Sequence, residues 1–111
     1  MILKLVSETI GTFFLLLIVV GSGIMGENLT DNKAIILLAN STATFLGLTV
    51  LIWTFAPYSG SHFNPAVSII MMLLGRLTKI ETILFILCQV IGGIAGVMVA
   101  NIIFDLSIIS I

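Results

Sequence analysis

Charged side chains are scarce in this sequence. Four residues are Lys or Arg and five are Asp or Glu, which together make 8% of the 111 residues. A soluble domain this small has a large surface for its volume and needs far more charge to stay in solution. Hydrophobic residues make 59% of the chain, and the mean hydropathy is +1.33. The composition therefore predicts an integral membrane protein, and the net charge of -1 gives no reason to expect a nucleic-acid partner.

Side chains that carry out catalysis or bind metals are equally few. The chain has one cysteine, Cys88, inside an apolar run, so no disulfide can form within it. It has one histidine, His62, and its five acids are scattered, which leaves no nucleophile and base at a suggestive spacing. We therefore expect no enzyme, no metal site and no cofactor. A structural, hydrogen-bonded role for His62 is favoured over metal binding or acid–base chemistry.

Long uncharged apolar runs are present in three places. They predict helices over about 5–26, 34–56 and 82–104, with the second run ended by Pro57. Each run reaches the roughly 20 residues that cross about 30 Å of hydrocarbon. Lipid offers no water to unpaired backbone groups, so each segment should be helical.

The basic residues are unevenly distributed between the loops. Lys4 precedes the first helix, and Arg76 and Lys79 precede the third, whereas Lys33 alone lies in the connection between the first two. The positive-inside rule then places the N-terminus in the cytoplasm and the 27–33 connection outside. An odd number of spans puts the C-terminus outside as well.

A shorter apolar run lies within "YSGSHFNPAVSIIMMLLGR", residues 58–76. Asn64 is a strong N-cap residue, and Pro65 suits the first helical position. The run ends at Gly75, after about 15 Å of helix, which is half the hydrocarbon thickness. Because Arg76 and the end of the second helix belong on the same side, residues 57–75 are predicted to form a re-entrant loop. In this prediction "APYSGSHF" enters the membrane without regular structure and a half-helix returns.

The extended part of that loop should expose backbone oxygens. The carbonyls of Gly60, Ser61, His62 and Phe63 cannot all pair within an extended segment, while Asn64 adds amide donors and the helix start adds partial positive charge. Acceptors, donors and a positive dipole at mid-membrane suit a small neutral solute and oppose cations and protons. The alternative is one long helix kinked at a proline.

These residues resemble a known family. "SGSHFNPAVS" resembles the first Asn-Pro-Ala box of the aquaporin, or major intrinsic protein, family. "SETIGTF" (7–13), "FLGLTVLIWTFA" (45–56) and "ILCQVIGGIAG" (86–96) resemble its first three helices. The family fold implied is six helices and two half-helices, arranged as an inverted repeat. The chain resembles the first repeat alone: an all-α membrane protein of three transmembrane helices and one re-entrant half-helix.

The resemblance implies roles for particular residues. Asn64, Pro65 and Ala66 correspond to the central donor site of the pore, and Gly60 to Phe63 supply carbonyls. The filter position of the second helix aligns best with Leu46, next to Phe45, and Val67 follows the Asn-Pro-Ala box. The filter arginine belongs to the second repeat, so the choice between water, glycerol and another solute stays open.

Two further polar residues lie within the apolar runs. Glu8 resembles the family's buried first-helix glutamate, which holds the re-entrant loop by accepting its N–H groups. A snorkelling interfacial charge and a proton relay are the alternatives. Gln89 lies beside a small-residue face formed by Gly92, Gly93, Gly96 and Ala100, where helices pack closely and an amide can hydrogen-bond across. Together with Glu8, Gln89 is expected to support the re-entrant loop.

The function expected is passive: half of a channel for water or a small neutral solute such as glycerol, excluding ions and protons. One repeat cannot enclose a pore, so a second repeat is required, as a separate chain, a C-terminal half or an antiparallel copy. The family resemblance also implies that such channels assemble as tetramers in membrane lipid. The alternatives are a non-conducting membrane interaction subunit and an inactive fragment of a full-length aquaporin.

Overall fold

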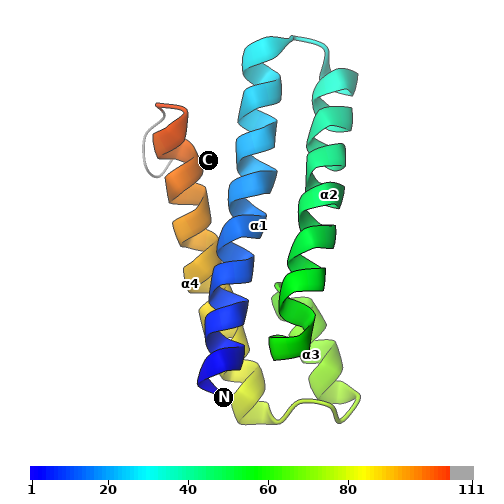
Figure 1. Cartoon of the computed structure of the whole chain (residues 1–111), viewed down its shortest axis with the longest axis vertical. Coiled ribbons are helices and arrows are strands. Elements are labelled where there is room, and N and C mark those ends of the chain that lie inside the picture. The colour runs from blue at the N-terminus through cyan, green and yellow to red at the C-terminus, as the bar shows by residue number, and fades with distance from the viewer. Residues whose placement is uncertain (106–111) are drawn as a thin grey trace.

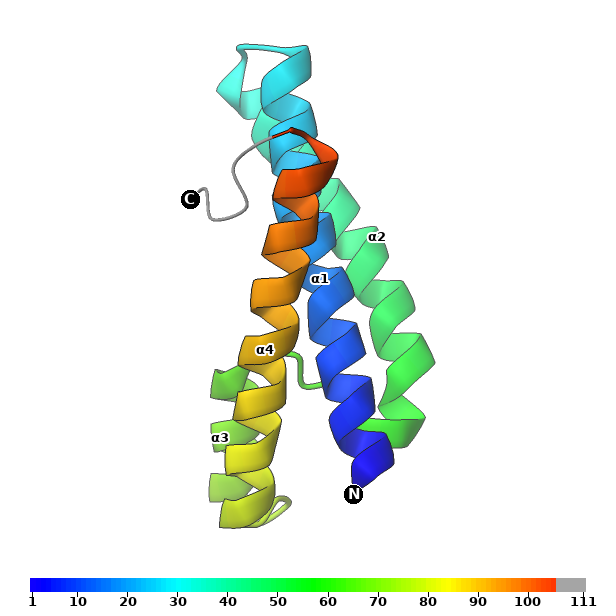
Figure 2. The same ribbon diagram turned by 90° about the vertical axis from the view of Figure 1, so that its left-hand side faces the viewer.

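The structure, a computed structural model, describes residues 1–105 and consists of four helices in this range. These are α1 (Ile2–Leu29), α2 (Lys33–Ser59), α3 (Pro65–Leu73) and α4 (Lys79–Ile103). The long helix α1 lies at the centre and packs against both α2 and α4, while the short helix α3 packs against α4 (Figures 1 and 2). This confirms the predicted all-α fold with three long helices and one short one.

The three long helices have 28, 27 and 25 residues and mean hydropathies of 2.1, 2.0 and 2.5, so each is long and apolar enough to cross a membrane. Large apolar side chains cover their outer surfaces; Trp53 on α2, for example, is 83% exposed. A soluble protein would not leave so much apolar surface in water. The chain is therefore an integral membrane protein.

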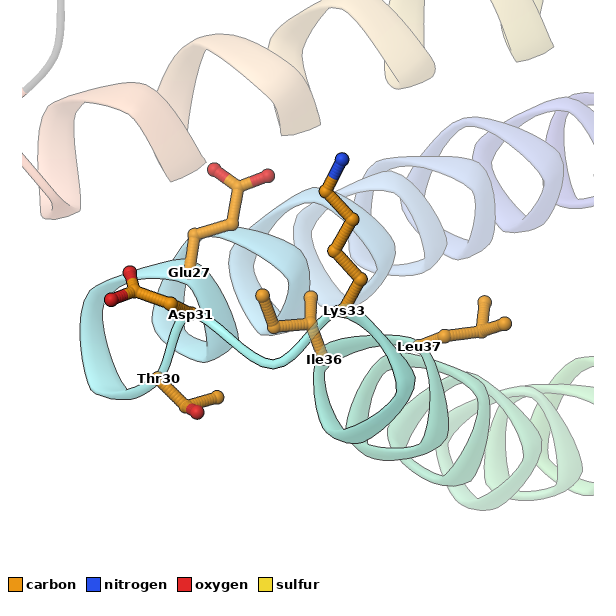
Figure 3. A pocket seen from close by; sticks show the side chains of 6 residues that line it. All are labelled: Glu27, Thr30, Asp31, Lys33, Ile36 and Leu37. Carbon is orange, nitrogen blue, oxygen red and sulfur yellow. The ribbon is translucent and has the colours of Figure 1, made fainter.

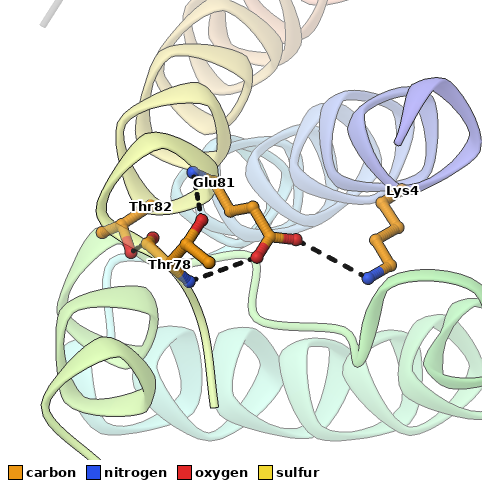
Figure 4. A network of polar contacts seen from close by, with 4 residues as sticks. All are labelled: Lys4, Thr78, Glu81 and Thr82. Carbon is orange, nitrogen blue, oxygen red and sulfur yellow. Dashed lines mark hydrogen bonds and ion pairs between the residues drawn. The ribbon is translucent and has the colours of Figure 1, made fainter. Parts of the chain in front are cut away.

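Helices α2 and α4 start earlier than the apolar runs suggest because polar residues cap them. Asn32 caps α2, where its side-chain oxygen accepts from the backbone N–H groups of Ala34 at 3.0 Å and Ile35 at 3.3 Å. Thr78 and Glu81 form a reciprocal capping box, so α4 begins at Lys79 instead of residue 82. Figure 4 shows this capping box.

The capping box of α4 is also tied to α1. The Lys4 ammonium lies 3.7 Å from the Glu81 carboxylate, which pairs the starts of the two helices at the same end of the molecule (Figure 4). The opposite end carries the connection between α1 and α2. There Glu27, Asp31 and Lys33 surround an open hollow with Thr30, Ile36 and Leu37 (Figure 3).

The prediction that α2 ends before Pro57 is wrong. The helix continues to Ser59 with Pro57 inside it, so the connection from α2 to α3 consists of Gly60 to Asn64. A proline in the last turns removes one helical hydrogen bond, to the Trp53 carbonyl, whereas unwinding 56–59 would release several at once. The Ser61 hydroxyl adds a bond of 3.2 Å to the Ile52 carbonyl, one turn before the proline. The non-helical part of the loop is therefore shorter than expected.

Helices α1 and α4 approach closely because α4 lacks side chains at the contact. A Cβ added at Gly92 would collide with the Thr9 carbonyl oxygen, and one at Gly96 with the Phe13 carbonyl oxygen. A Cβ added at Gly93, between them, would contact only side chains, at an ordinary van der Waals distance. Two glycines four residues apart thus let two backbones meet, which is how small residues act in membrane helices.

Candidate functional site

The connection between α2 and α3 has an unusual backbone. Gly60 ends α2 in the left-handed region with φ of 87°, and Ser61 and Phe63 both have φ of 52°. Side-chain-bearing residues adopt this region only where their surroundings hold them in it. In Figures 1 and 2 the segment leads back alongside α4, where α3 begins.

The Glu8 carboxylate holds this segment. Glu8 is completely buried, and its Oε1 accepts from the Phe63 N–H at 2.9 Å while its Oε2 accepts from the His62 N–H at 3.2 Å. The Ser59 hydroxyl donates to Oε2 at 2.6 Å and the Gln89 amide to Oε1 at 2.8 Å. Four donors on two oxygens suit an ionised carboxylate, which accepts only. Full burial with four partners does not fit a charge that snorkels to the membrane surface.

A second group of polar side chains joins this cluster to α3. The Gln89 amide nitrogen also lies 2.9 Å from the Ser68 hydroxyl, and that hydroxyl lies 2.9 Å from Nδ1 of His62. Ser68 is fully buried and Gln89 is 2% exposed. The chain of bonds therefore runs from α1 through α4 to α3 and back into the loop.

An aromatic side chain fixes the loop from the other side. Phe63 is 4% exposed, and its ring occupies the place where a side chain at Gly11 would be. Phe55 meets the same ring edge-on, with centroids 6.1 Å apart. The Phe63 side chain thus packs inside the protein, so this residue offers only its backbone carbonyl to a pore.

The start of α3 is capped by the residue that the sequence indicated. Asn64 is exposed, and its side-chain oxygen accepts from the Ala66 N–H at 2.8 Å, while Pro65 occupies the first helical position. The amide nitrogen of Asn64 bonds to no other described residue, so its two hydrogens are available. Nine residues give α3 a length of about 14 Å. Gly75, with φ of 76°, ends it through bonds from Gly75 to Met72 and from Arg76 to Met71.

The loop presents acceptors that the protein does not use. Among residues 1–105, no hydrogen bond reaches the carbonyl oxygens of Gly60, Ser61, His62 or Phe63. The N–H groups of His62 and Phe63 are turned toward Glu8, and those carbonyls lie next to the Asn64 amide donors in sequence. Such a row of acceptors followed by a donor can bind the oxygen and hydrogen atoms of a small neutral molecule.

Comparison with known proteins identifies the family. Residues 1–108 match the family described as Major intrinsic protein. The chain belongs to that family. This confirms the resemblance seen in the sequence, and since major intrinsic proteins are passive channels, it agrees with the expectation that the chain is not an enzyme.

Individual relatives in the family extend well beyond this chain. Aquaglyceroporin AqpS of Rhizobium meliloti (strain 1021) is 47% identical over 103 residues, which cover 93% of this chain and 44% of the relative. Aquaporin Z of Photorhabdus laumondii is 36% identical over 103 residues, with the same two coverages. Nodulin-26 of Glycine max is 35% identical over 91 residues, 82% of this chain and 33% of the relative. The chain thus spans less than half the length of these relatives.

Other predicted site residues of this major intrinsic protein lie apart from the loop. Leu46 is 58% exposed on α2, next to Phe45, which is 68% exposed. Within the described residues α2 packs against α1 and not against α3, so no helix contact brings Leu46 to the start of the half-helix. Val67 is partly buried in the first turn of α3. A filter position at Leu46 therefore stays a prediction.

Two residues of the cluster were missed in the sequence. Ser59 donates to Glu8, and Ser68 connects Gln89 to His62. The signal for Ser68 is a polar residue inside the apolar run of the half-helix, where a buried hydroxyl needs partners. Ser59 gives no such signal, because it belongs to a Gly/Ser-rich stretch, and such a stretch predicts a turn.

Proposed function

We propose that this chain forms one half of a channel for water or for a small neutral solute such as glycerol. The observation that carries the proposal is the loop held by Glu8, which leaves the carbonyls of residues 60–63 without partners and the Asn64 amide free at the start of α3. The names of the relatives, an aquaglyceroporin and an aquaporin, support water and glycerol as the solutes.

The proposed site passes neutral solutes and excludes ions and protons for an electrostatic reason. The N-terminus of a helix carries roughly half a positive charge, and at Asn64 this charge is joined by amide N–H donors. A cation meets repulsion there, and a water molecule that accepts from the amide cannot at the same time pass a proton along a continuous chain.

A second repeat is required to close the proposed pore. The loop, α3 and the exposed side of α2 form one wall, and a repeat of reversed orientation would supply the other. We propose that it comes from a separate chain or a C-terminal half, and that the assembled channels are oligomeric, with tetramers expected from the family. The N-terminus, Arg76 and Lys79 face the cytoplasm in this arrangement.

A chimera tests the channel proposal. The segment of the Rhizobium meliloti aquaglyceroporin that this chain matches is replaced by residues 1–108, and osmotic swelling of proteoliposomes is followed by stopped flow. We expect solute flux above that of empty liposomes. Asn64→Asp should lower the flux or admit cations, because aspartate caps the helix as well as asparagine but removes the amide donors.

The matched control for that variant is Asn32→Asp. Asn32 caps α2 in the same way, at the opposite end of the molecule from the loop. It should leave flux and cation leak unchanged. Equal permeability in the Asn64→Asp and Asn32→Asp chimeras would remove Asn64 from the proposed site, and a chimera that folds without conducting would contradict the channel proposal.

A further inference from the structure

The hydrogen bonds around Gln89 have only one consistent direction. Its amide nitrogen lies 2.8 Å from Oε1 of Glu8, which as a carboxylate oxygen already held by Phe63 can only accept. The amide of Gln89 must therefore turn its nitrogen to Glu8. The second hydrogen on the same nitrogen points to the Ser68 hydroxyl oxygen, 2.9 Å away. Gln89 donates both bonds.

This direction decides what Ser68 does. The Ser68 oxygen accepts from Gln89, so its single O–H is left to donate. Ser68 is fully buried, and among residues 1–105 the only other partner of its hydroxyl is Nδ1 of His62 at 2.9 Å. If Nδ1 carried a proton, the Ser68 hydrogen would be buried without an acceptor, which is costly. Nδ1 must therefore be the acceptor.

We propose that Ser68 is a positioning residue that fixes His62 as the neutral tautomer with its proton on Nε2, and so keeps it from relaying protons. The proton-blocking part rests on the proposed channel function. A histidine beside a water path is a hazard, because its ring takes up and releases protons near neutral pH. Here the only lone pair of the ring is occupied by Ser68. A water molecule beside the ring would therefore contact the Nε2–H donor and would find no basic nitrogen to protonate.

The exposed nitrogen of the ring lies where a solute can reach it. His62 is partly buried, and Nε2 bonds to none of the described residues. A Cβ at Gly60 would lie 3.3 Å from Nε2, so the absence of a side chain there leaves this nitrogen accessible. The Nε2–H would then stand beside the unpaired carbonyls as a donor to a neutral oxygen.

Groups from α1, α3 and α4 lie around the ring. From α4, Phe85 lies with its ring centroid 5.1 Å from that of His62, and Gln89 donates toward Ser68. From α3 only Ser68 bonds to the ring. The charged group of the cluster is Glu8 from α1, which bonds to the backbone N–H of His62 and already has four donors.

The tautomer can be observed directly because the chain has a single histidine. The full chain is labelled with ¹⁵N- and ¹³C-histidine, reconstituted in lipid and examined by solid-state NMR at neutral pH. We expect a protonated Nε2 and an unprotonated Nδ1. A wild-type spectrum with the proton on Nδ1 overturns the proposal. This measurement needs no flux, so its result is independent of whether the chain conducts.

Two variants test the part played by Ser68. Ser68→Thr keeps the hydroxyl and should keep the wild-type ring signals, whereas Ser68→Ala should give a mixture of the two tautomers. Identical ring signals in wild type and Ser68→Ala would show that Ser68 does not fix the ring. If Ser68→Ala does not fold, the wild-type spectrum and the Ser68→Thr spectrum still decide the assignment.

Proton leak tests the functional part in the chimera with the Rhizobium meliloti relative. A pH-sensitive dye inside proteoliposomes should report several-fold faster proton entry for Ser68→Ala than for Ser68→Thr, with similar water flux. Equal proton entry in two water-conducting variants would overturn the proton-blocking role. Absence of water flux in every chimera would instead count against the channel proposal.

Discussion

The Glu8 carboxylate accepts the backbone N–H of Phe63 at 2.9 Å across 55 residues of sequence. This bond joins the first helix to a loop residue whose φ of 52° is unfavourable for a side chain as large as phenylalanine. The conformation of the loop is therefore maintained by a residue that precedes it by about half of the chain. Substitutions of the α1 residues that contact the loop, Glu8 and Gly11, should therefore alter its conformation.

Glu8→Gln should destabilise the protein. The amide that replaces one carboxylate oxygen brings its own hydrogens toward groups that also donate, so at least one buried N–H loses its acceptor. Each such loss costs about 1–3 kcal/mol of the free energy of unfolding. Thermal unfolding of the purified chain in detergent should show a clearly lower Tm and a lower yield.

Glu81→Gln is the matched control for Glu8→Gln. Glutamine preserves the capping box with Thr78, and only the exposed contact with Lys4 is weakened. Its Tm should stay close to that of the wild type. A Glu8→Gln protein as stable as Glu81→Gln would mean that the four bonds at Glu8 contribute nothing to folding.

The sequence predicts the helices well because apolar length and capping residues are local signals. Asn64, Pro65 and Gly75 mark both ends of α3, and the structure has the helix between them. The end of α2 could not be predicted in the same way. Whether a helix ends at Pro57 depends on its surroundings. In lipid, which offers no hydrogen bonds, the turn after the proline stays helical so that its backbone groups remain paired, and this is not a local property of the sequence.

The polar cluster could be predicted only in part. Residues with an unusual chemistry for their place, such as Glu8 and Gln89 in apolar runs, attract attention in a sequence. Ser68 gives a weaker signal, as a small polar residue in the apolar run of α3, and Ser59 gives none, because serine is common in loops. Their roles arise from contacts between different helices, α2 with α1 for Ser59 and α3 with α4 for Ser68, and only the folded chain brings those helices together.

Gly92→Ala should separate α1 from α4. The added methyl group would collide with the Thr9 carbonyl oxygen, which belongs to backbone and cannot rotate away. Overpacking of this kind costs about 1–3 kcal/mol or more. Gly93→Ala is the control from the next position: its methyl group would lie 3.6 Å from Thr12 and Leu16 side-chain carbons, an ordinary contact. The Tm should fall for the first variant and be maintained or rise for the second.

Gly11→Ala should disturb the loop through Phe63. The new methyl group would occupy the position of the Phe63 ring, so the ring must move and its backbone N–H must shift relative to Glu8. Gly21→Ala, on the same helix, would meet only Phe104 at 3.7 Å and serves as the control. The ¹³C and ¹⁵N ring signals of the single histidine, next in sequence to Phe63, should change for Gly11→Ala and stay constant for Gly21→Ala. Unchanged histidine signals in Gly11→Ala would show that the Phe63 ring does not position the loop.

The last prediction is that the chain by itself inserts in one orientation and does not conduct. The start of α1, with Lys4, lies at the same end of the molecule as the connection with Arg76 and the start of α4 at Lys79, whereas Lys33 lies at the other end (Figures 1, 3 and 4). A protein that inserts in both orientations should have a nearly balanced charge, which three against one is not. Two copies in the same orientation would place both α3 helices in the same half of the membrane and leave the other half without a pore lining.

Cysteine labelling measures that orientation. In a Cys88→Ala background, Asn28→Cys reports the exposed last turn of α1, next to its connection to α2, and Leu77→Cys reports the connection of α3 to α4. In right-side-out vesicles a membrane-impermeant maleimide should label Asn28→Cys at once and Leu77→Cys only after permeabilisation. Proteoliposomes that contain the chain alone should swell no faster than empty ones. Labelling of both positions from outside, together with water flux from the chain alone, would contradict this prediction and favour an antiparallel pair of identical chains, in which each copy supplies the repeat that the other lacks.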